Sequence, residues 1–127
     1  MKIDGRLIGI EYPPYIIAEM SANHNGSLQR ALDIIRMARD AGADAVKLQT
    51  YTADTMTLDV DHPRFRVKGD NPWDGAHLYD LYKQAAMPWE WHQELFGYGN
   101  EIGITIFSSP FDATAVELLQ SLDAPAY

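Results

Sequence analysis

The feature that most constrains the fold of this chain is a strand, a helix and a second strand in close succession over residues 16–50. Residues 16–21 and 45–50 are short apolar stretches typical of buried strands. Between them, the segment 28–41 has apolar residues every three or four positions, the pattern of an amphipathic helix: Leu28, Ala31, Leu32, Ile35 and Ala38. Such short connections predict two parallel neighbouring strands joined by a right-handed crossover helix.

Both predicted strands carry polar side chains toward their carboxyl ends, although a parallel strand covered by helices usually reads as continuously apolar. Because strand side chains alternate between faces, Glu19 shares a face with Ser21, and Lys47 shares a face with Gln49. One interpretation is a buried ion pair between Glu19 and Lys47, since buried charges are costly unless they are paired. We favour an active site, because ligands bind at the carboxyl ends of the strands in parallel α/β folds.

The flanking segments carry less chemistry. Residues 1–15 predict a short strand or hairpin, with Ser27 as the amino-terminal cap of the first helix and Gly42 near its end. The polar connection 51–75 is broken by prolines and glycines, and connections of this length are usually functional or mobile. It leaves the carboxyl end of the second strand, so we expect it to roof the same pocket.

The second half of the chain repeats the alternation of helices and strands. We predict helices over 78–85, 88–96 and 114–122 and a strand over 104–109. Gly97 and Gly99 predict fraying or an early end of the second of these helices, because glycine is unfavourable in a helix interior. Asp112 is the expected cap of the last helix, and Ala126 and Tyr127 are expected to begin another strand.

These alternating elements predict an α/β fold of parallel strands, the N-terminal portion of a (β/α)8 TIM barrel. A complete barrel of this kind needs about 250 residues, whereas this chain has 127. We therefore expect residues 1–127 to be the N-terminal part of a barrel domain, in a chain that stops before the barrel is complete. In that case the third main strand would have an open edge.

Composition excludes several classes of protein. A hydrophobic content of 46% supports one globular core, and the absence of cysteine gives no sign of an oxidising compartment. No apolar run approaches the roughly 20 residues that cross a bilayer, and the first residues lack the apolar core of a signal peptide, so we expect a cytoplasmic protein. The net charge of −8 argues against nucleic-acid binding. For the local basic cluster of Arg64, Arg66 and Lys68, a solvated loop is favoured over a ligand site.

Several motifs, in order along nearly the whole chain, resemble the sialic acid synthase family. They are Ile16–Glu19, Asn23–Gly26, Gly42–Thr50, Phe107–Phe111 and Ala124–Tyr127. Within that family, Pro72–Gly75, Leu78–Tyr82 and Pro88–His92 resemble the pseudaminic acid synthase branch. The resemblance implies condensation of phosphoenolpyruvate with an N-acetylated amino sugar, which forms a nonulosonic acid and releases phosphate.

The resemblance also implies roles for four residues. Lys47 binds phosphoenolpyruvate, and Ser109 donates a hydrogen bond to its phosphate or carboxylate. Gln49 and Glu19 orient the sugar, and Glu19 is a candidate for proton transfer. A divalent metal, Mn or Mg, would polarise the sugar aldehyde. Its ligands are expected in later strands, and no metal role is given to the four histidines of this chain: His24, His62, His77 and His92. A homodimer is the expected assembly of the full-length protein.

Two other hypotheses remain open from the sequence. Lys47 is also placed to act as the Schiff-base nucleophile of an aldolase barrel, which borohydride trapping with a carbonyl substrate would reveal. Alternatively, the chain is a noncatalytic binding or assembly module, in which case calorimetry would show no specific binding of phosphoenolpyruvate. The motif around Lys47 favours the synthase, and residues 1–127 alone are expected to be inactive.

Overall fold

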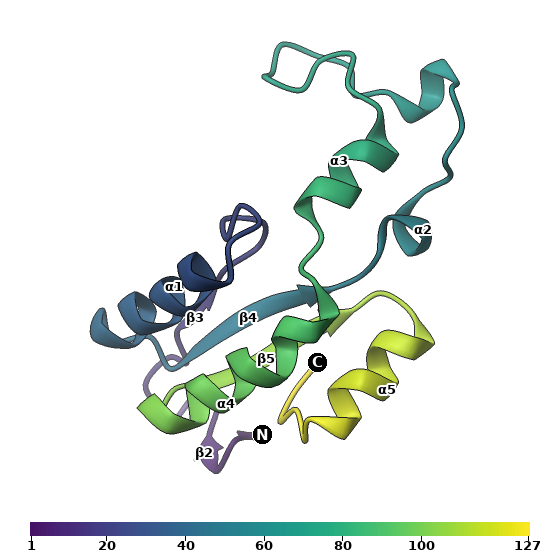
Figure 1. Ribbon diagram of the computed structural model, residues 1–127. Coiled ribbons are helices and arrows are strands. Elements are labelled where there is room, and N and C mark those ends of the chain that lie inside the picture. Colours follow the sequence, from purple (N-terminus) through teal and green to yellow (C-terminus); the bar gives the residue numbers. More distant parts are fainter.

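The main sheet has three parallel strands in the order β3, β4 and β5. The computed structural model describes all residues from 1 to 127 and places β3 at Ile17–Glu19, β4 at Ala45–Thr50 and β5 at Thr105–Pro110. Helix α1 (Leu28–Asp40) connects β3 to β4 (Figure 1). The predicted strand–helix–strand unit is therefore confirmed.

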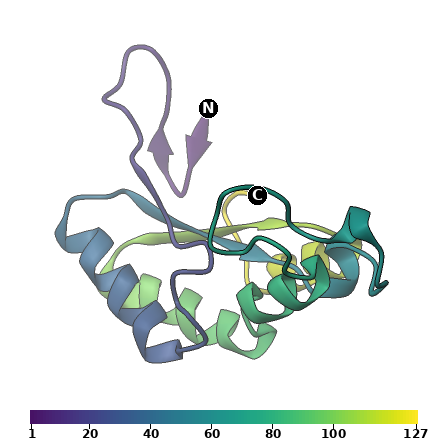
Figure 2. The same ribbon diagram turned by 90° about the horizontal axis from the view of Figure 1, so that it is seen from above.

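The helices that cover this sheet all lie on the same face of it (Figure 2). Apolar side chains from α1, from α4 (His92–Ile102) and from α5 (Ala113–Ser121) pack there against the strands. The buried core consists of Met20, Ala31, Ile35, Val46, Leu48, Met87, Leu95, Phe96, Ile104, Ile106 and Leu119. The opposite face of the sheet carries no helix, and it is the face toward which the polar residues of β4 alternate. None of the helices is long and apolar enough to cross a membrane.

Helix α1 begins and ends as its sequence predicts. The Arg30 amide donates a hydrogen bond to the Ser27 hydroxyl oxygen over 3.2 Å, which caps the first turn. At the other end, Gly42 adopts a φ of +87°, and the Ala43 amide donates to the Ala38 carbonyl oxygen over 3.0 Å. This left-handed glycine turn directs the chain into β4.

A small amino-terminal hairpin, β1 (Lys2–Ile3) and β2 (Arg6–Leu7), lies against the amino-terminal ends of the main strands. Asp44 forms an ion pair with Arg6 and accepts a hydrogen bond of 2.7 Å from the Ile16 amide. The Thr105 hydroxyl donates to the Asp4 carboxylate over 2.8 Å. The predicted hairpin is thus present, and it leaves the carboxyl ends of the strands open.

The long connection after β4 is more regular than its sequence predicts. It contains α2 (Ala53–Met56) and a 3-10 turn, η1 (Pro63–Phe65), and an isolated bridge pairs Arg66 with His77 before α3 (Leu78–Ala85). The Arg66 guanidinium forms an ion pair of 2.6 Å with Asp61, while Arg64 and Lys68 are exposed. This arrangement agrees with a solvated loop rather than a ligand site.

The early end predicted for the helix before β5 is wrong. After a short 3-10 turn, η2 (Trp89–Trp91), α4 continues through Gly97 and Gly99 to Ile102 and ends at Gly103, whose φ is +76°. A Cβ on Gly99 would overlap Ile106 Cγ1 and would lie 2.9 Å from the Ile104 carbonyl oxygen. Glycine therefore permits close packing of α4 on β5, and this tertiary contact outweighs its low helix propensity.

Several other boundaries differ from the prediction. β3 ends at Glu19, and Ser21 adopts a φ of +49°, so the strand does not reach residue 21. Helix α5 is displaced by one residue, and its predicted cap is confirmed because the Asp112 carboxylate accepts a hydrogen bond of 2.8 Å from the Ala115 amide. Ala126 and Tyr127 do not form a strand, because no neighbouring strand pairs with them.

Candidate functional site

The four predicted site residues lie on the helix-free face of the main sheet. The pairing register puts Glu19 of β3 opposite Lys47 of β4, and Gln49 of β4 opposite Ser109 of β5. Because residues in register on adjacent parallel strands project to the same side, all four side chains share one face. The structure therefore brings together the polar positions that the sequence suggested, near the carboxyl ends of three strands.

Lys47 and Glu19 form an ion pair in which the lysine Nζ lies 2.7 Å from the carboxylate Oε1. The Lys47 side chain is 27% exposed and that of Glu19 is 60% exposed. The pair weighed from the sequence does form, but the interpretation that both charges are buried is wrong, because the face is open above them. Lys47 thus presents a positive charge on an accessible surface of a chain with net charge −8.

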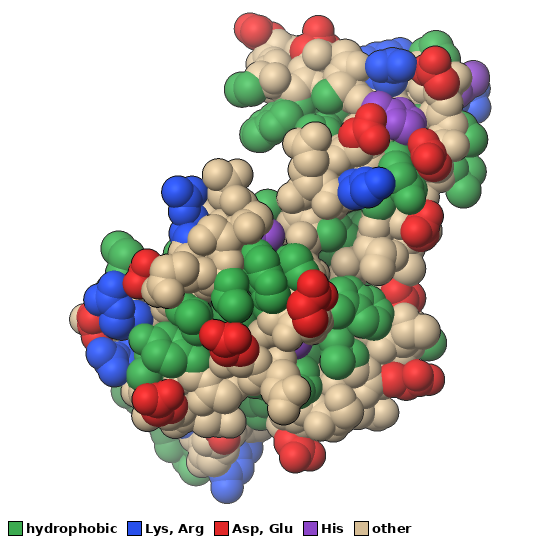
Figure 3. All heavy atoms as spheres, in the orientation of Figure 1, with side chains coloured by type: hydrophobic (Ala, Val, Ile, Leu, Met, Phe, Trp, Pro, Cys, Tyr) green, Lys and Arg blue, Asp and Glu red, His purple; other side chains and the backbone are tan.

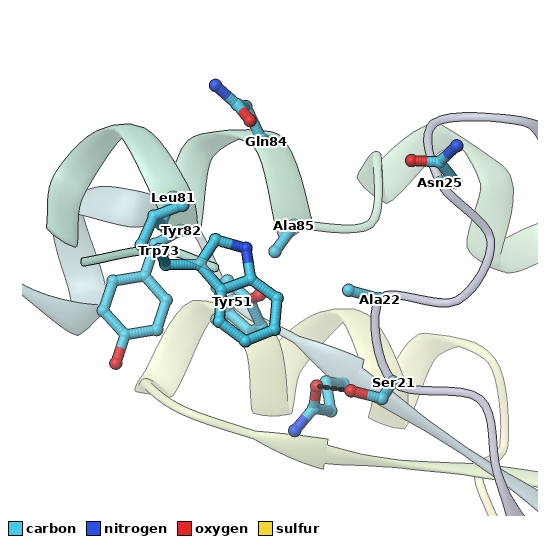
Figure 4. A pocket seen from close by; sticks show the side chains of 10 residues that line it. Ser21, Ala22, Asn25, Tyr51, Trp73, Leu81, Tyr82, Gln84 and Ala85 are labelled. Atoms are coloured by element: carbon cyan, nitrogen blue, oxygen red, sulfur yellow. Dashed lines mark hydrogen bonds between the residues drawn. The ribbon is translucent and has the colours of Figure 1, made fainter. Parts of the chain in front are cut away.

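The loop after β3 folds over the end of the sheet toward β4. Ser21, Asn25 and Gly26 all have positive φ angles, of 49°, 47° and 69°, which turn the chain tightly before α1 begins. The Ser21 hydroxyl then donates a hydrogen bond of 3.4 Å to the Gln49 side-chain oxygen (Figure 4). This long hydrogen bond connects the loop to the polar row on the sheet.

A cavity of about 450 Å³ lies beside Gln49. Its lining residues are Ser21, Ala22, Asn25, Gln49, Tyr51, Trp73, Leu81, Tyr82, Gln84 and Ala85. Trp73 and the α3 side chains lie on one side, and Ala22 and Asn25 of the loop after β3 lie on the other (Figure 4). The molecular surface is visibly hollowed between the part that contains α3 and the body around α1 (Figure 3). Trp73 belongs to the connection 51–75, so the predicted roof over the pocket is confirmed at that residue.

The lining of this cavity has no carboxylate, ammonium, guanidinium or imidazole group. Of the four predicted site residues, Gln49 alone lines it, while Lys47, Glu19 and Ser109 lie on the adjoining sheet face. The site therefore divides into a charged part around Lys47 and an uncharged part between Gln49 and Trp73. Such a division suits a ligand pair in which one member is an anion and the other is neutral.

Aromatic side chains form much of the cavity wall, and none of them was among the predicted site residues. The Tyr51 ring makes edge-to-face contacts with Tyr82 at 6.0 Å and Phe111 at 5.4 Å, and burial raises the pKa of the Tyr51 phenol. The sequence signal was present in Trp73, a large aromatic residue in a loop of prolines and glycines. Tyr82 of α3 lines the cavity, whereas Phe96 of α4 is buried in the core.

The histidines are explained by local structure. His24 is buried, with its ring edge-to-face with Trp91 at 5.6 Å and its Nδ1 accepting a hydrogen bond of 3.2 Å from the Gly26 amide. His62 and His77 make hydrogen bonds within the connection 51–77, at 3.2 Å and 2.9 Å. Burial lowers the pKa of His24 and of His92. No three His, Cys, Asp or Glu side chains of the chain come together as a possible metal site.

Comparison with known proteins identifies relatives along most of the chain. Residues 34–127 match the NeuB family. The chain is 48% identical to the pseudaminic acid synthase of Helicobacter pylori and 50% identical to that of Campylobacter jejuni, over 91% and 89% of its length. It is 33% identical to the human N-acetylneuraminate-9-phosphate synthase. These alignments cover 34%, 33% and 34% of the three relatives, so the chain spans about a third of their length.

Solved structures show the same likeness. The N-acetylneuraminic acid synthetase of Leptospira borgpetersenii superimposes with a TM-score of 0.76 at 26% identity, over 96% of this chain and 38% of that one. The spore coat polysaccharide biosynthesis protein SpsE of Bacillus subtilis superimposes with a TM-score of 0.71 at 32% identity, over 98% of this chain and 31% of that one. Together with the parallel sheet, these likenesses confirm the predicted fold class, the N-terminal portion of a (β/α)8 barrel.

Proposed function

Because this chain belongs to the NeuB family, we propose that the protein carrying it condenses phosphoenolpyruvate with an N-acetylated amino sugar to a nonulosonic acid. Pseudaminic acid is the product we favour, since two relatives with about half of their aligned residues identical are named pseudaminic acid synthases. The chain covers a third of those relatives, so the activity is proposed for the protein that carries it.

The observation that carries the proposal is the position of Lys47 beside an uncharged cavity. Phosphoenolpyruvate is a small, strongly anionic molecule, and an accessible ammonium group on the sheet face is suited to bind it. An N-acetylated amino sugar has no charge, and a cavity lined by amides, hydroxyls and aromatic rings is suited to it. The two ligands would then meet between Lys47 and Gln49, which are two residues apart on β4.

The remaining predicted residues take roles that fit their places. Ser109 lies opposite Gln49, so its hydroxyl is available as a donor to the phosphate or carboxylate of phosphoenolpyruvate. Glu19 pairs with Lys47 over 2.7 Å and is mostly exposed, which leaves carboxylate oxygen free to orient the sugar or move a proton. Gln49 contacts the cavity directly and would hold the sugar.

The proposed chemistry forms one carbon–carbon bond and breaks one carbon–oxygen bond. The methylene carbon of phosphoenolpyruvate attacks the aldehyde carbon of the open-chain sugar, and the aldehyde oxygen gains a proton to become a hydroxyl. Water adds to the electron-poor carbon that carries the phosphate, and phosphate leaves with the bridging oxygen. The protein's part is to hold both ligands and to stabilise the charge that shifts during these steps.

A divalent metal, Mn or Mg, stays a prediction from the family resemblance. When bound, such a metal would polarise the sugar aldehyde. The residues of this chain do not form a site for it, since no three of its His, Cys, Asp and Glu side chains converge. We therefore assign no step to a metal held by this chain, and the expected homodimer likewise stays a prediction.

The test is an assay of the complete protein with phosphoenolpyruvate, a divalent metal and a series of N-acetylated amino sugars. We expect phosphate release that depends on the sugar, and a product whose mass is that of the sugar plus the pyruvate unit. Phosphoenolpyruvate consumption without such a product would overturn the proposal. A lysine adduct trapped by borohydride with a carbonyl substrate would instead support the aldolase alternative.

A further inference from the structure

Three polar side chains are fully buried on the helix side of the sheet, behind the candidate site. They are Thr50 of β4, Ser108 of β5 and His92, the first residue of α4. The Thr50 Oγ1 atom lies 2.6 Å from Ser108 Oγ and 2.8 Å from His92 Nε2. We call these three residues the rear triad.

The rear triad lies next to the site residues along both strands. Thr50 follows Gln49 in β4, and Ser108 precedes Ser109 in β5. Because side chains alternate between faces, Gln49 and Ser109 project to the open face while Thr50 and Ser108 project to the helices. A shift of either buried hydroxyl therefore moves the adjacent site residue through the backbone they share.

The donor and acceptor groups of the rear triad favour one direction for its two hydrogen bonds. If His92 Nε2 accepts, Thr50 donates to His92 and Ser108 donates to Thr50, so both hydroxyl protons are used. If Nε2 donates instead, Thr50 Oγ1 accepts from it, and only one of the two hydroxyl protons is used between Thr50 and Ser108. The first order leaves the histidine proton on Nδ1, which has no hydrogen-bond partner of good geometry but lies near the backbone of Pro88 and Trp89.

The surroundings favour the neutral imidazole that this order requires. Burial lowers the pKa of His92. The ring also lies at the start of α4, where the positive end of the helix dipole disfavours a positive charge on the imidazole. With a neutral His92, one arrangement of protons uses both hydroxyl donors within the triad.

Stability alone gives little reason for such a network. The core around it is apolar, and buried polar groups are tolerated only when they are satisfied. What the network adds is a defined geometry, since short hydrogen bonds connect β4 to β5 and to α4 at one point.

We propose that the rear triad of Thr50, Ser108 and His92 is a positioning device that holds Gln49 and Ser109 in register for the synthesis reaction. This inference rests on the proposed function and adds three positioning residues to it. None of the three lines the cavity, so they act through Gln49 and Ser109.

The experiment compares Thr50→Val and Ser108→Ala in the complete protein with two controls, Ile106→Val and Ile106→Ala. Ile106 lies on the same buried face of β5, two residues before Ser108, and has no polar group. Thr50→Ser retains the hydroxyl and serves as the rescue variant. Each protein is measured for Tm and for kcat and KM toward both ligands, and variants are compared at equal loss of Tm.

We expect Thr50→Val and Ser108→Ala to lower kcat/KM for the sugar by about tenfold, because misplacing a site group by a fraction of an ångström reduces the rate steeply. At equal loss of Tm, kcat/KM of the Ile106 variants should stay within about twofold of the wild-type value. Thr50→Ser should have most of the wild-type kcat/KM, because it retains the hydroxyl. If kcat/KM falls with the loss of Tm to the same extent in the triad variants and in the Ile106 variants, the triad is only structural and this inference is overturned.

A second measurement does not depend on turnover. In the complete protein with ¹⁵N-labelled histidine, the ring nitrogen shifts should show His92 neutral with its proton on Nδ1, and the Nε2 shift should move in Thr50→Val. A proton on Nε2 in the wild type would overturn the donor order. If the wild type makes no product, the proposed function is wrong. If the wild type makes product but the Thr50 and Ser108 variants behave like the Ile106 controls, only the positioning role of the rear triad is wrong.

Discussion

Lys47 of β4 and Glu19 of β3 face each other in register across two parallel strands, with the lysine Nζ 2.7 Å from the glutamate Oε1. Both side chains project from the sheet face that carries no helix, and Glu19 is 60% exposed. An ion pair this exposed contributes only about 0–1 kcal/mol to stability. The pair therefore contributes little to folding, which agrees with the proposed role of Lys47 in ligand binding.

The first prediction follows for Lys47→Ala in the complete protein. We expect it to abolish synthesis and to weaken phosphoenolpyruvate binding by about 10- to 100-fold, because a hydrogen bond to a charged group contributes about 1.5–3 kcal/mol. Calorimetry with phosphoenolpyruvate measures the affinity, and circular dichroism should show an intact fold. Arg36→Ala is the control, since it removes a positive charge from the outer surface of α1. Affinity like that of the wild type in Lys47→Ala would defeat the proposed role.

The second prediction separates the two ligands. Gln49→Ala should raise KM for the sugar by about two- to tenfold while changing KM for phosphoenolpyruvate by less than about twofold, because removing one hydrogen bond at a binding site loses about 0.5–1.5 kcal/mol. Gln49 lines the uncharged cavity and Lys47 does not. Steady-state kinetics with each ligand varied in turn provide the measurement, with Gln29→Ala on the exposed side of α1 as control. Equal losses for both ligands would indicate general damage to the site.

The third prediction uses two glycines of one helix as a matched pair. Gly97→Ala should stabilise the protein by about 0.5–1 kcal/mol, because a Cβ there meets no atom within 4 Å and alanine is the better helix former. Gly99→Ala should destabilise it by about 1–3 kcal/mol, because its Cβ would overlap Ile106 and the Ile104 carbonyl oxygen. Thermal melting should therefore rank Gly97→Ala above the wild type and Gly99→Ala below it. The reverse order for Gly99→Ala would mean that α4 and β5 do not approach this closely.

Gly97 and Gly99 also show which features of the fold local sequence patterns do not predict. The helix α1 and its flanking strands were predictable, because a local pattern of apolar residues and caps specifies them. Gly99 was misjudged, because its effect depends on the close packing of α4 against Ile106 of β5, which helix propensity does not describe. The turn at Ser21 was missed for a similar reason, because its positive φ is not encoded by a glycine.

The residues of the candidate site were likewise predictable from the sequence only in part. Glu19, Lys47, Gln49 and Ser109 were predictable, because polar residues in apolar strands stand out and alternation places them on one face. The connection after β4 was predicted to cover the site, but the residues of the cavity wall were not predicted, since Tyr51, Trp73 and Tyr82 come together only through the path of that connection. The rear triad joins residues 42 and 58 positions apart in sequence, so no local pattern reveals it.

The fourth prediction concerns pH. Burial lowers the pKa of both His24 and His92 in the folded protein, whereas in the unfolded chain both should titrate near the usual value of about 6.5. As pH falls below that value, the unfolded chain binds protons that the folded protein does not, so stability declines. Above about pH 7.5 both histidines are neutral in the unfolded chain as well, so they cost the folded protein no stability. As pH falls from there toward the lowered pKa values, the free energy of unfolding decreases.

Thermal melting of the complete protein between pH 8 and 5 measures this decline. His92→Gln should remove part of the slope, because one of the two buried imidazoles is gone. The carboxyl of Asp112 does not interfere in this range. Its pKa is lowered by hydrogen bonds from Thr114 and the Ala115 amide, so its contribution is lost only in more acidic solution. A slope that His92→Gln leaves unchanged would contradict the prediction.

The last prediction concerns residues 1–127 expressed alone. They should have no synthase activity, and the chain should be marginally stable or self-associating. The strands β3 and β5 each pair on one side only, and one face of the sheet lacks a covering layer of helices. Apolar side chains are exposed there, with Ile17 at 41%, and unpaired strand edges promote association between chains.

Light scattering and denaturant unfolding of this segment test the expectation. Self-association or a broad, early transition would agree with a sheet that needs further strands. A monodisperse monomer that unfolds cooperatively, with stability in the usual range of about 5–15 kcal/mol, would contradict it, because three strands would then suffice for a native domain. Turnover of phosphoenolpyruvate and sugar by the segment would show that Lys47, Gln49 and their neighbours need no groups from elsewhere in the protein.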